Sequence, residues 1–329
     1  MIEISTHRLK QISIEDLSEI AQLTLVAREA SALKEGDIAL IGIELTVKGI
    51  KEFLQKYQAS SSPFGVITVR SNGTLIGWLM ISLDPDMPSL SPYHPVISPN
   101  NITKDLATQL IKQALDYARK EGLKKVQAFL EIAEHLEQLN NIYRSWYEAE
   151  NLTLRGESYS MLLSLSEYQP ESIKLPENFL AKPILDVDKD ELYQCYVETF
   201  KTSLDRWNLD LTDEERQKQF NNSVQPSSSS LNKDASLGLL HNKKIVGFSI
   251  VENVSPEVGY LLDFGIHPDF RGRKIGKSLL RLTINNLAKQ GLKTVTLHSD
   301  SQNDPAVILY RDVGFKITNN TMRYQIRFR

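Results

Sequence analysis

Residues 271–276 read RGRKIG and combine two glycines with three cationic side chains. Their last two residues begin IGKSLLRLTINNLAKQ, an apolar run with helical spacing, so they are the expected start of a helix. The first backbone N–H groups of a helix have no intrahelical acceptor and lie at the positive end of the helix dipole. Glycine also lets the backbone approach a ligand closely. This combination is typical of a loop that holds a pyrophosphate group.

The residues that we expect to contact such a ligand are contiguous. They are Arg271, Gly272, Arg273, Lys274, Ile275, Gly276 and Lys277. The alternative is a solvated basic helix start without a ligand. The phosphate loop of nucleoside triphosphatases does not fit, because its pattern has four residues between the glycines and this loop has three.

A second motif, NDPAVILYRDVGF at residues 303–315, follows the strand-like TVTLH. Asp304 and Pro305 favour a helix start, and Gly314 is a natural C-terminal cap. The spacing predicts a short helix that carries Tyr310. A phenol with a pKa of about 10 stays protonated at neutral pH and can act as an acid, although a half-buried aromatic residue packed on the sheet is the alternative.

The chain contains an internal repeat. KEGLKKVQAF and KQGLKTVTLH place Gly122 and Gly291 169 residues apart, and the same offset aligns ISPNNITKDLATQLI with IHPDFRGRKIGKSLL without a gap. Matches upstream (NGTLIGWLMI with NKKIVGFSIV) and downstream (YEAENL with YRDVGF) occur in the same order. We therefore expect two copies of one domain, residues 1–168 and 178–329, joined by the proline-containing, polar segment 166–179.

Each copy predicts the same succession of elements, which favours an α/β fold: two domains, each a mixed, mostly antiparallel sheet flanked by helices. A strand and a helix come first, and a hairpin with an Asn-containing turn follows a variable region. The expected strand, helix and hairpin lie at 6–13, 14–29 and 66–82 in the first copy and at 179–185, 188–200 and 236–251 in the second.

On these motifs the second copy resembles the GNAT superfamily of acyl-CoA-dependent N-acetyltransferases. The CoA loop of that family is written [QR]xxGx[GA]; Arg271 and Gly276 match its ends, and Lys274 replaces its middle glycine. The family motif N-x-x-A-x-x-L-Y-x-x-x-G-F is matched in full by residues 303–315. The resemblance covers residues 180–329 directly and the first copy through the repeat.

The resemblance implies that acetyl-CoA is the co-substrate and that an amine attacks its thioester directly. It assigns Tyr310 as the acid that protonates the leaving thiolate and places Asn303 beside the cofactor. The backbone of Phe264 and Ile266 is expected where the family holds pantetheine and the acetyl carbonyl. The resemblance says almost nothing about the acceptor. A primary amine of a small molecule or of a peptide is expected, and a non-catalytic acyl-CoA-binding sensor is the alternative.

Three candidates for the general base stay open. His298 lies five residues before Asn303, and imidazole can accept a proton near neutral pH. Asp263 lies on the strand before the loop, where strict alternation places it with Gly265 and His267, opposite Leu262, Phe264 and Ile266. A water chain is the third candidate.

The first copy has lost the loop. Its aligned residues 102–107 read ITKDLA, without glycine or arginine, and Asp105 repels a pyrophosphate. The helix after it keeps its apolar spacing. We expect a non-catalytic domain that shapes or covers the acceptor site, with one CoA bound per chain. The acceptor is expected to enter over the acidic segment 199–216, which includes Asp205; an ordinary charged helix surface is the alternative.

Composition limits the remaining function classes. The 329-residue chain has a net charge of −3 and a pI near 6.1, which gives no support to nucleic-acid binding. We expect neither a transmembrane helix nor a signal peptide, and a cytoplasmic setting fits the single cysteine, Cys195, which we read as a buried, inert thiol. No Cys/His cluster predicts a metal site. The oligomeric state is open.

Overall fold

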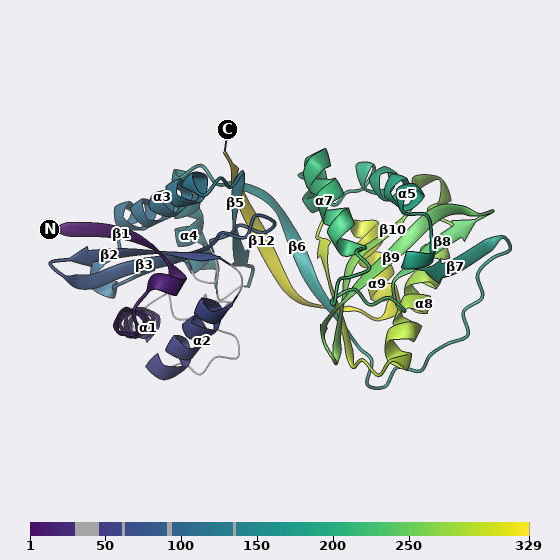
Figure 1. The fold of residues 1–329 in the computed structure, drawn as a ribbon, viewed down its shortest axis with the longest axis horizontal. Helices are drawn as coiled ribbons and strands as arrows, with labels where there is room; N and C mark the ends of the chain where they lie inside the picture. Colours follow the sequence, from purple (N-terminus) through teal and green to yellow (C-terminus); the bar gives the residue numbers. More distant parts are fainter. Residues whose placement is uncertain (30–45, 61–62, 91–93, 134–135, 329) are drawn as a thin grey trace. The chain divides into compact units, whose positions relative to one another are not determined.

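The structure is a computed structural model that describes residues 1–29, 46–60, 63–90, 94–133 and 136–328. It divides into two compact units: Met1–Arg155 together with Thr321–Arg329, and Gly156–Asn320. Each has helices packed on a sheet (Figure 1). No helix in the described ranges is both long and apolar enough to cross a membrane.

The elements follow the predicted succession. From the N-terminus they are β1 (Ile2–Arg8), α1 (Ile14–Glu29), α2 (Val47–Ala59), β2 (Phe64–Ser71), β3 (Thr74–Ser82), β4 (Val96–Ile97), α3 (Lys104–Lys120), β5 (Lys125–Glu131) and α4 (Glu137–Ala149). The chain continues with β6 (Thr153–Ser164), β7 (Phe179–Pro183), α5 (Lys189–Lys201), α6 (Arg206–Leu209), α7 (Asp213–Ser223), β8 (Leu237–His241), β9 (Lys244–Ser255), β10 (Val258–Ile266), α8 (Ile275–Lys289), β11 (Thr294–Asp300), α9 (Asp304–Val313) and β12 (Lys316–Arg327).

The repeat seen in the sequence is also a repeat of structure. The short 3-10 helices Pro99–Asn101 and Pro268–Phe270 are 169 residues apart, and so are both ends of β5 and β11. Helices α3 and α8 also end at equivalent residues, and each is followed by a glycine with positive φ. The ungapped alignment across this part of the chain is therefore confirmed.

The last strand of each copy runs from its own compact unit into the unit of the other copy. Strand β6 pairs antiparallel with β11 in the second unit, whereas β12 pairs antiparallel with β5 in the first. The second unit contains the strand order β12-β6-β11-β10-β9-β8-β7, in which β10 and β11 are parallel. Residues 156–168 of the first sequence copy thus lie in the second unit.

Local sequence accounts for most element boundaries. The expected helix at 14–29 is α1, and the two hairpins turn at Asn72–Gly73 and Asn242–Lys243, all with positive φ. The predicted first strand at 6–13 was misplaced: β1 ends at Arg8, and residues 9–11 form a 3-10 turn whose Leu9 is buried. The apolar pattern read as a strand end is here a turn that packs into the core.

Candidate active site

Helix α8 begins without any side-chain cap. Its N-cap residue is Lys274, and none of the backbone N–H groups from Gly272 to Lys277 donates a hydrogen bond to a described residue. Gly272 has φ +73° and Lys274 has φ 61°, so the loop turns through the left-handed region twice. These N–H groups remain available at the positive end of the helix, as an anion site requires.

Lys274 adopts the backbone conformation that glycine provides at the middle position of the family's loop pattern. The left-handed region costs a residue with a Cβ atom about 1 kcal/mol or more. Lys274 therefore stands in a left-handed conformation that glycine adopts without this cost.

The side chain of Arg271 points to the fold, not to the loop. Its Nε donates to the carbonyl oxygen of Ile266 at 3.0 Å, and Nη2 donates to the carbonyl oxygen of Thr199 at 2.7 Å, near the end of α5. Burial lowers its pKa. Arg271 thus ties the loop to α5, and the Ile266 carbonyl, expected to face the cofactor, already has a donor.

The remaining loop residues divide between surface and core. Arg273 donates to the carbonyl oxygen of Asp269 at 2.9 Å and lies over the Phe270 ring, and Lys277 forms an ion pair of 3.3 Å with Asp312. Ile275 is buried and anchors the first turn. The side-chain charges near the free N–H groups therefore come from Arg273, Lys274 and Lys277.

Strands β10 and β11 separate beside this loop. Their parallel pairing runs from Val258 opposite Thr294 to Leu261 opposite Leu297 and then stops, although β10 continues to Ile266 and β11 to Asp300. On its other edge β10 stays paired with β9 up to Ile266. The edge of β10 beyond Leu261, including Phe264, thus pairs with no strand that the structure describes, and an extended ligand can pair with it.

A β-bulge changes the faces of β10. The register with β9 shifts between Leu261 and Asp263, so strict alternation fails there. Leu262 packs with the cluster around Tyr196, whereas Phe264 packs with the cluster around Tyr310. The expectation that Leu262 shares a face with Phe264 was wrong, because the bulge inserts one residue into the alternation.

Asp263 is a buried carboxyl group. Burial raises its pKa to about 7, and the nearby carboxylates of Asp205 and Glu252 act in the same direction. The hydroxyl of Tyr196 on α5 donates to Oδ2 at 3.3 Å and partly opposes the shift. A carboxyl group that titrates near neutral pH can accept a proton under working conditions.

Tyr310 lies on α9 as predicted, between Asn303 at the N-cap and Gly314 at the C-cap with φ 110°. Burial raises its pKa, and Asp205 and Asp263 raise it further. Its ring meets Phe264 edge to face at 6.3 Å between centroids. Neither its hydroxyl nor the Asn303 amide hydrogen-bonds to a side chain or backbone group that the structure describes.

His298 lies on β11 opposite Ser160 of β6. Its Nε2 is 3.1 Å from the Ser160 hydroxyl, and its ring centroid is 5.7 Å from that of Tyr260. The residue is exposed, yet desolvation by the surrounding sheet lowers its pKa. His298 is therefore neutral near pH 7, but one ring nitrogen is already engaged.

Most acidic residues of the segment 199–216 form hydrogen bonds or ion pairs with residues close to them in the sequence. Glu215 forms a capping box with Thr212, and Asp213 pairs with Arg216. Asp205 caps α6 and is also the carboxylate whose charge acts on both Asp263 and Tyr310. Within the segment 199–216, Asp205 is thus the residue whose charge acts on the candidate site.

Two features of this site gave no signal in the sequence. Tyr196 reads as one apolar position of a helix face, but its hydroxyl reaches Asp263, 67 residues away. Arg206 binds both carboxylate oxygens of buried Asp300 at 2.8 Å and so fixes α6 to the end of β11. Only the pairing of distant elements creates these contacts.

In the first unit, the two positions that correspond to Asp263 and Tyr310 hold side chains that bind each other. Counting back by 169 from Asp263 gives His94, and the counterpart of Tyr310 is Tyr147. His94 Nδ1 is hydrogen-bonded to the Tyr147 hydroxyl, and both residues are buried. Burial lowers the pKa of His94 to about 4. The tyrosine hydroxyl in this copy thus has an internal partner.

Metal and thiol chemistry find no support in the described part of the chain. Within it, no three His, Cys, Asp or Glu side chains gather as metal ligands. Cys195 is buried on α5, and burial raises its thiol pKa to about 11. A thiol with that pKa is a poor nucleophile near neutral pH.

The sequence model of the acetyltransferase (GNAT) family matches residues 43–146 and 190–315. These matches cover more than half of the chain, one in each copy. The chain therefore belongs to the acetyltransferase (GNAT) family, with a tandem architecture.

Curated relatives match parts of the chain. A mycothiol acetyltransferase of Corynebacterium glutamicum (strain R) is 33% identical over 89 residues, which are 27% of this chain and 30% of that protein. A mycothiol acetyltransferase of Streptomyces scabiei is 26% identical over 179 residues, 53% of this chain and 54% of that protein. The matched regions thus span at most about half the length of these relatives.

Solved structures share the fold over nearly the full length. A GCN5-related N-acetyltransferase from Sphaerobacter thermophilus has a TM-score of 0.61 at 16% identity and covers 98% of this chain and 95% of its own. A tandem GNAT protein from the clavulanic acid biosynthesis pathway has a TM-score of 0.53 at 14% identity, with 99% and 98% covered. At these identities the likeness shows the fold.

Proposed function

We propose that this protein is an N-acetyltransferase that uses acetyl-CoA and a primary amine, and that the reaction takes place in the second unit. The observation that carries the proposal is the uncapped start of α8, whose free N–H groups suit a pyrophosphate. The unpaired edge of β10 beyond Leu261 suits the extended pantetheine arm. The residues present therefore fit the cofactor.

When bound, acetyl-CoA supplies an activated acyl group as a thioester. Asp263 is the base that we propose first, because its buried carboxylate accepts a proton near pH 7 and its Oδ2 is oriented by Tyr196. His298 is the alternative base. Tyr310 keeps its proton because burial raises its pKa, and its hydroxyl is the group we assign to protonate the departing sulfur.

The acceptor is proposed to be a small cationic amine. Asp205 and Asp263 give this side of the site an excess of negative charge, which favours an ammonium group. The relatives named for mycothiol favour a small molecule over a protein N-terminus. By contrast, the first copy is proposed to be non-catalytic, since its helix start and its tyrosine are both internally bonded.

A thiol-release assay with acetyl-CoA across polyamines, amino sugars, amino acids and peptides tests this function. We expect Tyr310→Phe to lower turnover about 100-fold while acetyl-CoA binding is retained, because a general acid contributes at least that much. Tyr193→Phe, which removes the hydroxyl of a half-buried tyrosine on α5, is the matched control.

Three outcomes would contradict parts of the proposal. Undiminished transfer by Tyr310→Phe would remove the acid role. Binding of acetyl-CoA without release on any acceptor would favour a binding protein over an enzyme. Calorimetry that finds two acetyl-CoA sites per chain would overturn the assignment of the first copy.

A further inference from the structure

Arg206, the first residue of α6, binds one buried carboxylate through both its backbone and its side chain. Its backbone N–H donates to Oδ2 of Asp300 at 3.0 Å, and its Nε and Nη2 donate to Oδ2 and Oδ1, each at 2.8 Å. Asp300 ends β11, and its side chain is 6% exposed. Paired N–H···O bonds fix the direction of the planar guanidinium as well as its position. Helix α6, which has only four residues, is therefore held to the sheet at its start.

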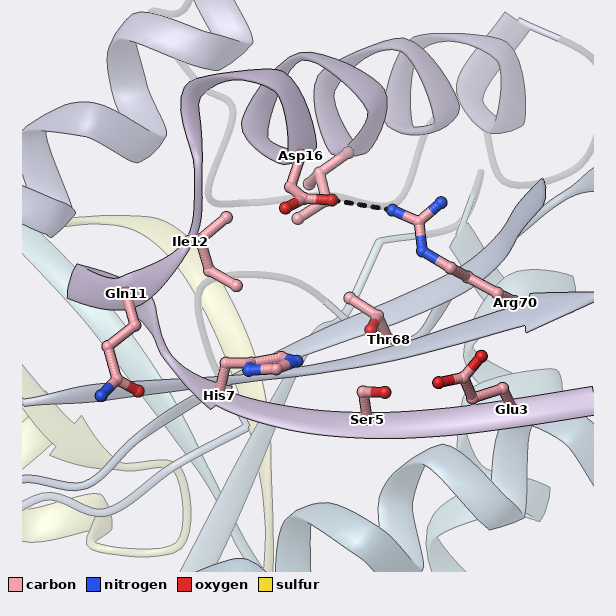
Figure 2. Close-up of a pocket in the computed structure, with 9 residues that line it drawn as sticks. Glu3, Ser5, His7, Gln11, Ile12, Asp16, Thr68 and Arg70 are labelled. Atoms are coloured by element: carbon pink, nitrogen blue, oxygen red, sulfur yellow. Dashed lines mark hydrogen bonds and ion pairs between the residues drawn. The ribbon is translucent and has the colours of Figure 1, made fainter. Parts of the chain in front are cut away.

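An arginine of the first unit also joins a helix to a sheet. Beside the cavity between α1 and the strands β1 and β2, Arg70 of β2 donates to Asp16 of α1 at 2.8 Å (Figure 2). The side chain of Asp16 is 46% exposed, so water can replace this bond at little cost. At buried Asp300, by contrast, loss of the guanidinium leaves a charge uncompensated. Removal of the arginine should therefore displace α6 and leave α1 in place.

The guanidinium of Arg206 fits against Gly156 of β6, the last strand of the first sequence copy. A Cβ atom at position 156 would lie 2.8 Å from Nε and from Cζ of Arg206, closer than Cβ atoms come to other atoms in proteins, and the three nearest atoms all belong to that side chain. Beside it, the carbonyl oxygen of Glu157 accepts from Nη2 at 3.4 Å. A methyl group at 156 therefore pushes the guanidinium away from Asp300. The last strand of the first copy thus helps to hold α6.

Asp205 directly precedes Arg206 and caps α6, where its carboxylate accepts the N–H of Asn208 at 3.2 Å. The contact of Arg206 with Asp300 lies on the face of β11 that carries His298, because the two β11 residues are two positions apart in an unbroken register with β6. Burial raises the pKa of four groups of the candidate site, and the negative charge of Asp205 raises each further: Tyr196, Tyr260, Asp263 and Tyr310. Because the interaction of two charges weakens with distance, Asp205 lies near all four.

We propose that Arg206, Asp300 and Gly156 are positioning residues, which hold the carboxylate of Asp205 where it binds the ammonium group of the acceptor. This inference rests on the proposed transfer to an amine and adds the residue that binds the acceptor. A carboxylate binds an ammonium group through charge-assisted hydrogen bonds, whose strength depends on their length and direction. A four-residue helix has no stability of its own to keep that direction. The first copy thus contributes to acceptor binding through β6.

Steady-state kinetics on the full chain tests this assignment with acetyl-CoA and four amines: spermidine, glucosamine, lysine and trialanine. For the amine with the highest wild-type kcat/KM, Gly156→Ala and Arg206→Gln should each raise the amine KM at least about tenfold. The value of kcat should fall less than about threefold and acetyl-CoA affinity should stay the same, because this assignment gives Asp205 a contact with the amine alone. Arg70→Gln, which removes the exposed arginine contact of the first unit, is the matched control and should leave all three quantities unchanged.

A double-variant cycle separates positioning from a general loss of structure. Asp205→Asn keeps an N-cap for α6 but removes the charge, so it should raise the amine KM as much as Gly156→Ala does. If Gly156 acts through Asp205, the double variant should be no worse than Asp205→Asn alone. Wild-type KM in Gly156→Ala, or additive effects of the two substitutions, would overturn this inference and leave the proposed function standing. A wild type that transfers acetyl to none of the four amines would contradict both.

Discussion

Helices α3 and α8 end at equivalent residues but begin in different ways. Thr103 caps α3: its hydroxyl accepts the N–H of Leu106 at 3.2 Å, and Asp105 adds a negative charge in the first turn. At α8 the N-cap is a left-handed lysine, with neither a side-chain acceptor nor an acidic residue in the first turn. In the first copy a side chain caps the start of the helix, whereas in the second copy the first N–H groups stay available to an anion.

The same contrast holds at the tyrosines. Tyr147 is fully buried and bonded to His94, whereas the hydroxyl of Tyr310 has no partner among the described groups, and Asp263 stands at the position of His94. A helix cap contributes about 1 kcal/mol, so the first copy has gained stability where the second keeps binding groups unsatisfied. The two copies thus differ in whether the helix start and the tyrosine hydroxyl are satisfied within the fold.

The largest expected effect comes from Asp263. Asp263→Asn keeps the shape and the contact to Tyr196 but removes the proposed base, so we expect turnover to fall by about 100-fold or more. The activity of the wild type should rise with pH through about 7, where this carboxyl loses its proton. Steady-state kinetics over pH measures both.

Two variants accompany that measurement. Glu257→Gln, an exposed carboxylate before β10, is the control and should leave turnover unchanged. His298→Gln tests the other base. If His298→Gln abolishes turnover and Asp263→Asn does not, the base assignment is reversed.

Exchange of the helix starts has the next largest effect. Replacing GRKIG at 272–276 with TKDLA from 103–107 caps α8 and introduces an acid, while Arg271 is kept because it holds α5. Charge-assisted hydrogen bonds contribute about 1.5–3 kcal/mol each, so acetyl-CoA affinity should fall about 100-fold. Calorimetry measures the affinity.

Arg273→Gln is the control for charge alone and should weaken binding by less than about tenfold. A loss as large as that of the exchanged loop would show that side-chain charge, not the open backbone, carries the affinity. The reverse exchange into α3 should not create a second catalytic site, because His94 still binds the Tyr147 hydroxyl.

The pH dependence of stability should have opposite signs in the two units. Folding lowers the pKa of His94 from 6.5 to about 4, so the unfolded state binds more protons between these pH values. The free energy of unfolding should therefore fall by about 3 kcal/mol as the pH decreases through this range. Folding raises the pKa of Asp263 from 3.8 to about 7, so the folded state binds more protons between these pH values. The free energy of unfolding should therefore fall by about 4 kcal/mol as the pH rises through this range.

Thermal unfolding of His94→Gln and Asp263→Asn over pH checks these signs. Relative to the wild type, His94→Gln should gain stability toward acid pH, and Asp263→Asn should gain it toward alkaline pH. Parallel pH curves for a variant and the wild type would show that the group does not titrate on unfolding.

The smallest effect is expected at Lys274. Lys274→Gly relieves the left-handed conformation but adds freedom to the unfolded chain, so the free energy of unfolding should change by less than about 1 kcal/mol. Acetyl-CoA affinity should stay within about threefold of the wild type. A large loss of affinity would mean that the Lys274 side chain, and not only its backbone, holds the ligand.

Much of the fold could be predicted because its signals are local. Helix α1 has the expected bounds, the Asn turns close both hairpins, and Gly314 ends α9 as its position predicts. The internal repeat predicted which residues of the two copies are equivalent. The strand at 6–13 was misplaced because an apolar Leu9 fits a buried turn as well as it fits a strand.

The candidate site could be predicted only in part. The loop at 271–276 and the helix of Tyr310 lie where the motifs place them, since each motif is a continuous stretch. The direction of Arg271 was not predictable, because it depends on α5, whose Thr199 is 72 residues away. The cavity under α1 likewise joins β1 and β2 from distant parts of the sequence.

The sequence by itself determined the two copies, the loss of the loop in the first and the positions of the loop and Tyr310 in the second, because backbone preferences and spacing act over a few residues. Only the tertiary structure decided which acid is buried, which hydroxyl orients it and which copy receives each last strand. Burial, and with it the pKa of Asp263, depends on packing by α5 and on a bulge against β9. No local pattern encodes either.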